Sequence, residues 1–308
     1  MLTFDLHYHP NIANLSKGVR DRRLERHRRI FELNRPDCVA CTEHSYKNPY
    51  DAYLYLTEAA LDTDTFVMPG VECISREGVE IVFLYPSEQD LKSALKANRP
   101  FGWSIKDVGR IAEATGAVSI VPHPFSLARS GAGNVLSPAG YSRVLKLVDY
   151  VEIHNGSALT LMQRISTKGA RPLFKKTMEK ISWTLNLPHD QRGESLGWAI
   201  SSDAHYPGEQ FIIGSTDRTL KPGETYFDLL RNRIRFEGVM VSSPSENTIV
   251  NNMRLFRNVR CAMSEGINKD FRMMRMIPGN GQEKYDKIVQ RVGREFKRRA
   301  GKVLRSDR

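Results

Sequence analysis

The sequence predicts an α/β fold in which a parallel sheet closes into a barrel. Short apolar segments alternate with longer amphipathic ones about seven times over the first ~240 residues, a repetition typical of parallel sheets. Histidines and carboxylates follow nearly every apolar segment. This distribution favours a closed barrel over an open sheet, in which functional residues would gather at one or two crossover points.

Each strand is predicted from a short apolar run and each helix from apolar residues recurring at helical spacing. No internal repeat or low-complexity tract interrupts the alternation. In chain order we expect strand 2–7, helix 18–33, strand 38–42, helix 49–61, strands 66–72 and 79–84, helices 88–97 and 105–115, strand 118–121, helix 142–147, strand 150–153, helix 172–185 and strand 198–201.

The charge is distributed unevenly along the chain. The formal net charge is +11, and residues 250–308 alone hold 16 basic and 6 acidic residues. We therefore predict two parts: a near-neutral barrel over residues 1–245 and a basic, mainly helical extension over residues 246–308. The extension could contact the phosphates of RNA or DNA nonspecifically, or pack an apolar stripe on the barrel or on a second subunit.

The N-terminal segment has no basic region followed by an apolar one, and no uncharged apolar run approaches ~20 residues. We therefore expect a cytoplasmic protein without membrane contact. Four cysteines are too few for a disulfide framework in 308 residues. Cys38 and Cys41 have the spacing of a zinc half-site but no partner pair, so we expect reduced thiols in the core. The sequence leaves the oligomeric state open.

The first candidate ligands follow the first predicted strand, in the segment Asp5-Leu6-His7-Tyr8-His9. Side chains alternate faces along a strand, so His7 and His9 share one face, about 7 Å apart. Imidazoles at this spacing can converge on one metal ion. Asp5 is expected on the same face. A lone His-x-His pair would be equally consistent with hydrogen-bonded core histidines, but this pair does not stand alone.

Similar groups follow the later strands, where a histidine is costly to bury unless it is bonded. A site that mixes imidazoles with carboxylates suits Zn²⁺, Mn²⁺ or Fe²⁺ better than Mg²⁺ or Ca²⁺. These groups are Thr42-Glu43-His44, Gly70-Val71-Glu72, Pro122-His123-Pro124, Glu152-Ile153-His154-Asn155 and Ser202-Asp203-Ala204-His205.

In order and spacing, these motifs resemble those of the PHP (polymerase and histidinol phosphatase) domain family. The resemblance covers roughly residues 1–240. It includes the segment from Ile213-Gly214 to Arg235, which resembles the family's closing strand and last helix. The resemblance implies a distorted, TIM-like, seven-stranded β/α barrel that hydrolyses phosphoesters with two or three divalent ions at the carboxyl ends of its strands. It implies a first ion held by His7, His9, Glu72 and Asp203, a second by Glu72 and His123, and a third by His44 and His205.

Four positions depart from the family pattern. Asn14 stands where many members have an Asp or His ligand. The family's histidine on the strand 79–84 is missing, so either Glu80 substitutes for it or the second ion is held loosely. Glu43 replaces the more usual Asp, and we expect it to orient an imidazole through its second nitrogen. His154 stands where an aromatic or small residue is common. Whether two or three ions bind therefore stays open.

The inferred mechanism is attack by a metal-bound hydroxide, which forms because ions about 3.5–4 Å apart lower the pKa of a bridging water. Asp203, His205 and His154 are the candidate catalytic residues, and a histidine that is not fully committed to a metal could protonate the leaving oxygen. Arg20, near the start of the first helix, and Arg129, in the loop after His123, are the candidate phosphate contacts.

The predicted function is metal-dependent hydrolysis of a phosphoester: a nucleotide, an oligonucleotide end or a small phosphorylated metabolite. The alternative is a non-hydrolytic nucleic-acid-binding or scaffold protein that keeps a structural metal site. Hydrolysis of a carbon–nitrogen bond ranks last, because no lysine stands where a carbamylated bridge between the metals would be expected.

Overall fold

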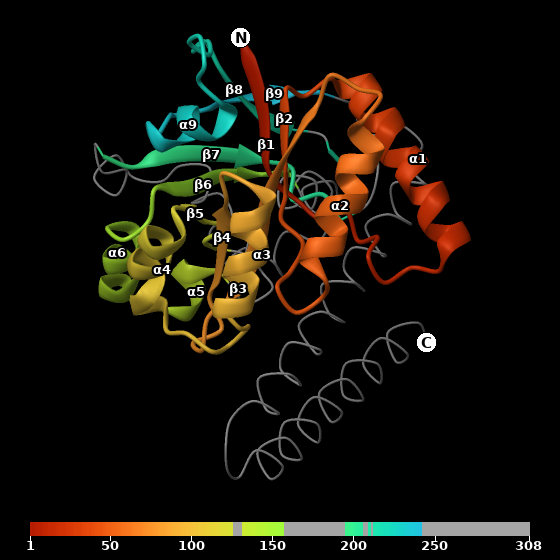
Figure 1. Cartoon of the computed structure of the whole chain (residues 1–308). Coiled ribbons are helices and arrows are strands. Elements are labelled where there is room, and N and C mark those ends of the chain that lie inside the picture. Colours follow the sequence, from red (N-terminus) through yellow and green to blue (C-terminus); the bar gives the residue numbers. More distant parts are fainter. Residues whose placement is uncertain (126–130, 157–194, 206–208, 211, 242–308) are drawn as a thin grey trace, which may run out of the picture. The chain divides into compact units, whose positions relative to one another are not determined.

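The computed structural model describes residues 1–125, 131–156, 195–205, 209–210 and 212–241 (Figure 1). The described strands form one mixed sheet in the order β7-β6-β5-β4-β3-β2-β1-β8-β9. They are β1 (Leu2–Tyr8), β2 (Cys38–Cys41), β3 (Phe66–Ile74), β4 (Glu80–Leu84), β5 (Val118–Val121), β6 (Tyr150–Asn155), β7 (Gly197–Ser201), β8 (Ile212–Thr216) and β9 (Glu237–Met240).

Along the chain, the helices of the described residues come between these strands (Figure 1). The predicted helix 142–147 begins earlier than expected, because Ser137 caps its N-terminus and Pro138 occupies the first turn. The helices are α1 (Lys17–Asn34), α2 (Pro49–Ala60), α3 (Glu88–Ala97), the 3₁₀ turn η1 (Ile105–Asp107), α4 (Val108–Thr115), α5 (Ala132–Val135), α6 (Pro138–Leu145) and α9 (Tyr226–Arg231).

The sheet curves until its first and last strands nearly meet, so the barrel is almost closed. At one end, Tyr8 forms a bridge with Ala204, just beyond β7. At the other end, Trp198 of β7 exchanges backbone hydrogen bonds with Ile234 and Phe236, which precede β9. Backbone contacts therefore close the barrel at both ends of β7, where the sheet has its edge.

Two expectations about the sheet are wrong. The described residues contain nine strands where seven were expected, since β8 and β9 extend the sheet beyond β1. The sheet is also not uniformly parallel: β4 is antiparallel to both β3 and β5, and β8 is antiparallel to β1. The short turn between Ile74 and Glu80 explains β4, because a parallel connection needs a dozen residues or more.

Alternating side chains place one apolar cluster inside the barrel. All of the strands β1 to β7 contribute to it, and segments from α9 to β9 fill its base. This dry layer excludes water from below the polar end described in the next subsection. Its strand members are Phe4, Leu6, Cys38, Ala40, Met68, Val82, Leu84, Val118, Ile120, Tyr150 and Ala199.

The opposite faces of the strands pack against helices. Val39, Cys41 and Val67 lie under α1 and α2, whereas Ile81, Phe83 and neighbouring residues lie under α3, α4 and α6. Cys41 and Cys73 are buried free thiols in these layers, Cys38 is one in the interior cluster, and burial raises the pKa of each. No helix in the described part of the chain has the length and apolar content to cross a membrane.

The arginine-rich helix α1 holds the barrel through three buried residues, Leu24, His27 and Phe31. His27 Nε2 donates to the carbonyl of Pro10 at 3.2 Å, so its Nδ1 accepts from the Tyr8 hydroxyl at 2.7 Å. Burial lowers the pKa of His27 to about 3. The helix is therefore docked through a neutral imidazole.

This docking predicts a pH dependence of stability. Because the pKa of His27 is below its unfolded value of about 6.5, its contribution is fully present above pH 6.5 and is lost as the pH falls toward 3. Below pH 6 the unfolding free energy of the wild type should decline relative to that of His27→Gln by up to about 1.4 kcal/mol per pH unit. Urea unfolding of both proteins at pH 7 and pH 5 measures this, and parallel pH profiles would contradict it.

Candidate metal centre

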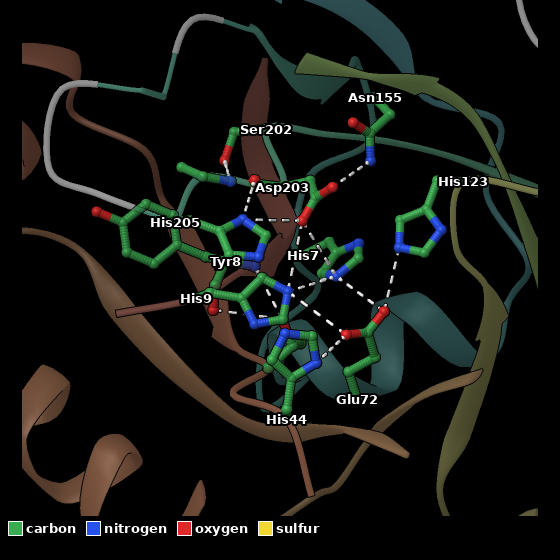
Figure 2. A network of polar contacts seen from close by, with 12 residues as sticks. His7, Tyr8, His9, His44, Glu72, His123, Asn155, Ser202, Asp203 and His205 are labelled. Atoms are coloured by element: carbon green, nitrogen blue, oxygen red, sulfur yellow. Dashed lines mark hydrogen bonds and ion pairs between the residues drawn. The ribbon is translucent and has the colours of Figure 1, made fainter. Parts of the chain in front are cut away.

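The seven residues predicted as metal ligands lie together at the end of the barrel where β1, β2, β5 and β7 finish (Figure 2). Six of them are buried, and His205 is partly exposed. With Glu80, their donor atoms form four overlapping groups in which all atoms lie within 4.8 Å of one another. The groups are His7, His9 and Asp203; His7, Glu72 and His123; His9, His44 and His205; and His44, Glu72 and Glu80.

An irregularity in β1 directs His7 and His9 into this cluster. The register of β1 against β2 shifts between Asp5 and Tyr8, so that Leu6 and His7 both face the interior while Tyr8 packs outward with Phe31. The Nε2 atoms of His7 and His9 then lie 2.9 Å apart. Strict alternation from Leu6 would have turned both imidazoles away from the centre.

The expected position of Asp5 beside these histidines is wrong for the same reason. The shift after Asp5 leaves its carboxylate outside the four ligand groups, where it is fully buried. It accepts hydrogen bonds from the backbone and hydroxyl of Ser202, at 2.9 and 2.6 Å, and from Gln210 at 2.8 Å. Burial raises the pKa of Asp5 to about 6, against the lowering effect of these hydrogen bonds. Asp5 thus ties β1 to the segment that carries Asp203.

Glu72 links the histidines from the different loops (Figure 2). Its Oε2 lies 2.6 Å from His44 Nδ1, and its Oε1 accepts from His123 Nε2 at 3.1 Å. Its oxygens also lie 3.6 and 3.7 Å from the Nε2 atoms of His7 and His9. Two positions earlier, a Cβ on Gly70 would lie 2.8 Å from Leu84, so only glycine lets β3 pack this closely. One carboxylate is therefore placed to bridge two ligand groups.

His123 and Asp203 occupy backbone conformations that are unusual for residues other than glycine. Their φ angles are +24° and +48°, and such conformations cost free energy unless neighbouring contacts maintain them. The amide of His123 donates to Glu152 Oε2 at 2.6 Å, and that of Asp203 donates to the carbonyl of His7 at 2.9 Å. Strained backbone at both candidate ligands is typical of a functional site.

The cluster has an excess of acidic charge. Burial opposes protonation of His7 and His123, but Asp203 and the neighbouring glutamates raise the pKa of His7, and contacts headed by Glu72 raise that of His123 to about 10. Burial would raise the pKa values of Glu72 and Asp203, yet the surrounding imidazoles hold both below their usual range. Both carboxylates therefore stay charged, and a divalent cation would neutralise that charge.

Two further carboxylates lie behind the ligands. Glu43 Oε1 is 3.8 Å from His9 Nδ1, beyond hydrogen-bond distance, so its orienting role stays a prediction; its Oε2 accepts from the amide of Asn11 at 2.8 Å. Glu152 Oε1 accepts from His7 Nδ1 at 3.3 Å. Glu152 stands in one of the motifs quoted from the sequence, but no role was predicted for it, although a glutamate inside an apolar strand was a usable signal.

Glu80 reaches the centre because β4 is antiparallel. The start of an antiparallel strand lies at the same end of the sheet as the ends of its parallel neighbours. Glu80 is 5% exposed and pairs with Ile74 beyond Glu72. Its Oε2 lies 3.9 Å from His123 Nε2. Glu80 is thus within the ligand cluster.

Three of the described residues that were named from the sequence lie outside this cluster. His154 is partly buried in β6 and belongs to none of the four groups, and Asn14 is exposed. The Arg20 guanidinium stacks on Tyr55 of α2, 4.4 Å from the ring centre, and donates to its hydroxyl at 2.7 Å. Arg129 is not among the described residues. The catalytic role of His154 and the phosphate contacts of both arginines stay predictions.

The donors fit a divalent transition metal. Five imidazoles and three carboxylates supply the mixed nitrogen and oxygen ligands that Zn²⁺, Mn²⁺ and Fe²⁺ accept, and Mg²⁺ or Ca²⁺ sites seldom contain imidazole. The opposed nitrogens of His7 and His9 also lie 3.6 and 3.4 Å from Asp203 Oδ1. Nitrogen and oxygen donors thus converge on common points, as metal coordination requires.

Comparison with solved structures finds PsfC from Pseudomonas syringae PB-5123, with a TM-score of 0.51 and 12% identity over 82% of this chain and 97% of that one. At this identity the two proteins share a fold, and no activity follows. A two-domain protein from Bacteroides vulgatus ATCC 8482 containing a predicted PHP-like metal-dependent phosphoesterase has a TM-score of 0.45 and 14% identity, over 78% of this chain and 65% of its own.

The lesion-specific endonuclease PfuEndoQ from Pyrococcus furiosus has a TM-score of 0.43 and 11% identity, over 75% of this chain and 55% of its own. The chain thus spans about two thirds or less of these last two proteins. No protein-family model matches the chain, and no curated protein does.

Proposed function

We propose that this protein is a metal-dependent phosphoesterase of the PHP type. The observation that carries the proposal is the convergence of all seven predicted ligands, together with Glu80, at the carboxyl end of a β/α barrel. In such barrels this end carries the active site. The ligands come from loops and strands spread over almost 200 residues of sequence. A set of histidines buried only for packing has no reason to meet there with charged carboxylates.

Phosphoester hydrolysis suits this arrangement. Divalent ions held by His7, His9, Glu72, His123 and Asp203 would act as Lewis acids that offset the charge developing on the phosphoryl oxygens. The apolar interior cluster packs beneath the strand ends that carry these side chains. The substrate class that we propose is a nucleotide, an oligonucleotide end or a small phosphorylated metabolite.

His205 is the proposed general acid. It is the most exposed member of the cluster, with 21% of its side chain accessible, so it can reach a leaving group at the mouth of the site. Its Nδ1 donates to the carbonyl of Asp203 at 3.0 Å and lies 3.5 Å from Asp203 Oδ1. Asp203 would orient this ring as well as bind metal. Proton donation to the leaving oxygen from a ring held this way is ordinary general acid catalysis.

The test is metal analysis followed by a panel of substrates. Purified protein should contain Zn²⁺, Mn²⁺ or Fe²⁺, and it should hydrolyse at least one of bis-p-nitrophenyl phosphate, a nucleoside bisphosphate and 5′-phosphorylated RNA. Chelation should abolish the activity, and adding the metal back should restore it. Protein that binds metal but hydrolyses no phosphoester would instead favour the non-hydrolytic nucleic-acid-binding or scaffold protein.

A further inference from the structure

We propose that Glu152 and Asn155 form a positioning pair that sets the tautomer of His7 and fixes the backbone of His123 and the carboxylate of Asp203. The inference deepens the proposed function, on whose metal site it rests. Neither residue belongs to the four ligand groups. They act on the metal-ligand residues through hydrogen bonds and do not belong to the ligand set themselves.

The contacts of this pair reach three ligands. Glu152 Oε1 accepts from His7 Nδ1 at 3.3 Å, and Glu152 Oε2 accepts from the amide of His123 at 2.6 Å. The same Oε2 accepts from Asn155 Nδ2 at 2.9 Å, and Asn155 Nδ2 also donates to Asp203 Oδ2 at 3.1 Å. Figure 2 shows the link from Asn155 to Asp203. Ligands from β1, from the loop after β5 and from the loop after β7 are thus connected through one strand.

A bulge in β6 makes this connection possible. Residues two apart on a regular strand share a face, which would pair Glu152 with His154. The register of β6 against β7 shifts between Glu152 and His154, so that Asn155 replaces His154 beside Glu152. Glu152 and Asn155 are 0% and 2% exposed. Bulges commonly re-aim side chains next to active sites, and here the bulge brings a carboxylate and an amide to the centre together.

The hydrogen bond to Glu152 determines which nitrogen of His7 can bind metal. A carboxylate only accepts hydrogen bonds, so the His7 proton stands on Nδ1 and the lone pair stands on Nε2. Nε2 is the nitrogen that faces His9, Glu72 and Asp203. Carboxylates that orient a ligating imidazole in this way typically contribute 10–100-fold to metal affinity.

The burial of Glu152 supports a role at the site over one in general stability. No ion pair joins Glu152 to a lysine or arginine within the part of the chain that the structure describes, and the one ion pair it makes there is with His7. A buried carboxylate is costly unless hydrogen bonds and a countercharge compensate it. The donors that compensate Glu152 are His7, His123 and Asn155.

The substitution Glu152→Gln separates these roles, because it keeps the shape of the side chain. Two N–H donors converge on Oε2, so the amide oxygen must occupy that position and the amide NH₂ group must face His7 Nδ1. The NH₂ group can only donate, which moves the His7 proton to Nε2 and removes the lone pair that would bind metal. A substitution that leaves the packing intact should therefore weaken metal binding.

The experiment is titration of the full-length metal-free protein with Co²⁺, followed by visible absorption. We expect about a 10–100-fold loss of Co²⁺ affinity in Glu152→Gln and a changed absorption band at saturation, with a smaller loss in Asn155→Ala. Nitrogen-15 chemical shifts of labelled histidines in the Zn²⁺-loaded protein report the tautomer of His7. The matched control is Asp149→Asn, which removes a carboxylate bound to Ser119 and Arg233 at the residue directly before β6.

The outcomes are distinguishable from those of the function test. Wild-type affinity and an unchanged absorption band in both Glu152→Gln and Asn155→Ala would overturn the positioning role, even if the protein is a phosphoesterase. Selective loss of Co²⁺ affinity in Glu152→Gln would support it, even if no phosphoester is hydrolysed. An equal loss in the Asp149→Asn control would show a general effect on the fold and would also overturn the proposal.

Discussion

Replacing His9 by alanine is expected to lower kcat/KM for any phosphoester substrate by at least about 1,000-fold. His9 belongs to two of the four ligand groups and lies between the rings of His44 and His205, each 4.4 Å away between centroids. Its loss removes one donor from both groups. Metal ions contribute several kcal/mol to transition-state stabilisation, and about 4 kcal/mol corresponds to three orders of magnitude in rate.

The matched control for this substitution is His27→Gln, which alters another fully buried histidine, outside the ligand groups. At pH 7.5 it should keep its metal content and its turnover. Turnover and metal content, the latter by elemental analysis, should fall together in His9→Ala. Full activity in His9→Ala would refute the proposed site.

The largest effect on stability is expected from Phe4→Ala, at about 3–5 kcal/mol in the free energy of unfolding. Phe4 is fully buried inside the barrel, and its ring contacts those of Tyr226 and Phe236 at centroid distances of 5.6 and 5.1 Å. Truncation would leave a cavity where β1 meets the segments that seal the base of the barrel. Urea unfolding should show a lower midpoint with an unchanged slope.

Phe66→Ala is the control for this prediction. Phe66 contacts the same Tyr226 ring at 5.5 Å, but it is 46% exposed. Little cavity forms at an exposed position, so the cost should be about 1 kcal/mol or less. Equal destabilisation by both substitutions would mean that the interior cluster of the barrel is not the main source of its stability.

Much of the fold was predictable because its signals are local. The apolar runs that form β1, β2, β3, β5, β6 and β7 are followed by polar residues at their ends, and both features can be read within a few residues of sequence. The antiparallel direction of β4 was not predicted, although the connection after Ile74 is too short for a parallel pair and was itself a local signal. The strands β8 and β9 were underestimated because β8 joins the sheet by pairing with β1, over 200 residues away in sequence, and β9 joins it only through β8.

For the candidate site, too, local signals were predictable from the sequence and long-range pairing was not. Its inventory of histidines and carboxylates at strand ends was determined by the sequence alone, because spacing and residue type are enough to mark potential ligands. Tertiary structure decided which of these residues meet. The register shift in β1 turned His7 inward and Asp5 away, and the bulge in β6 placed Asn155 beside Glu152 in the position expected for His154.

The physical reason is that register and strand direction depend on hydrogen bonds between segments far apart in the chain. A one-residue shift in such pairing reverses the face of every side chain beyond it, and no local pattern records the shift. The sequence by itself therefore determined which residues this protein offers to a metal centre. Only the pairing of its strands decided that Glu80 lies among them and that Glu152 lies behind them.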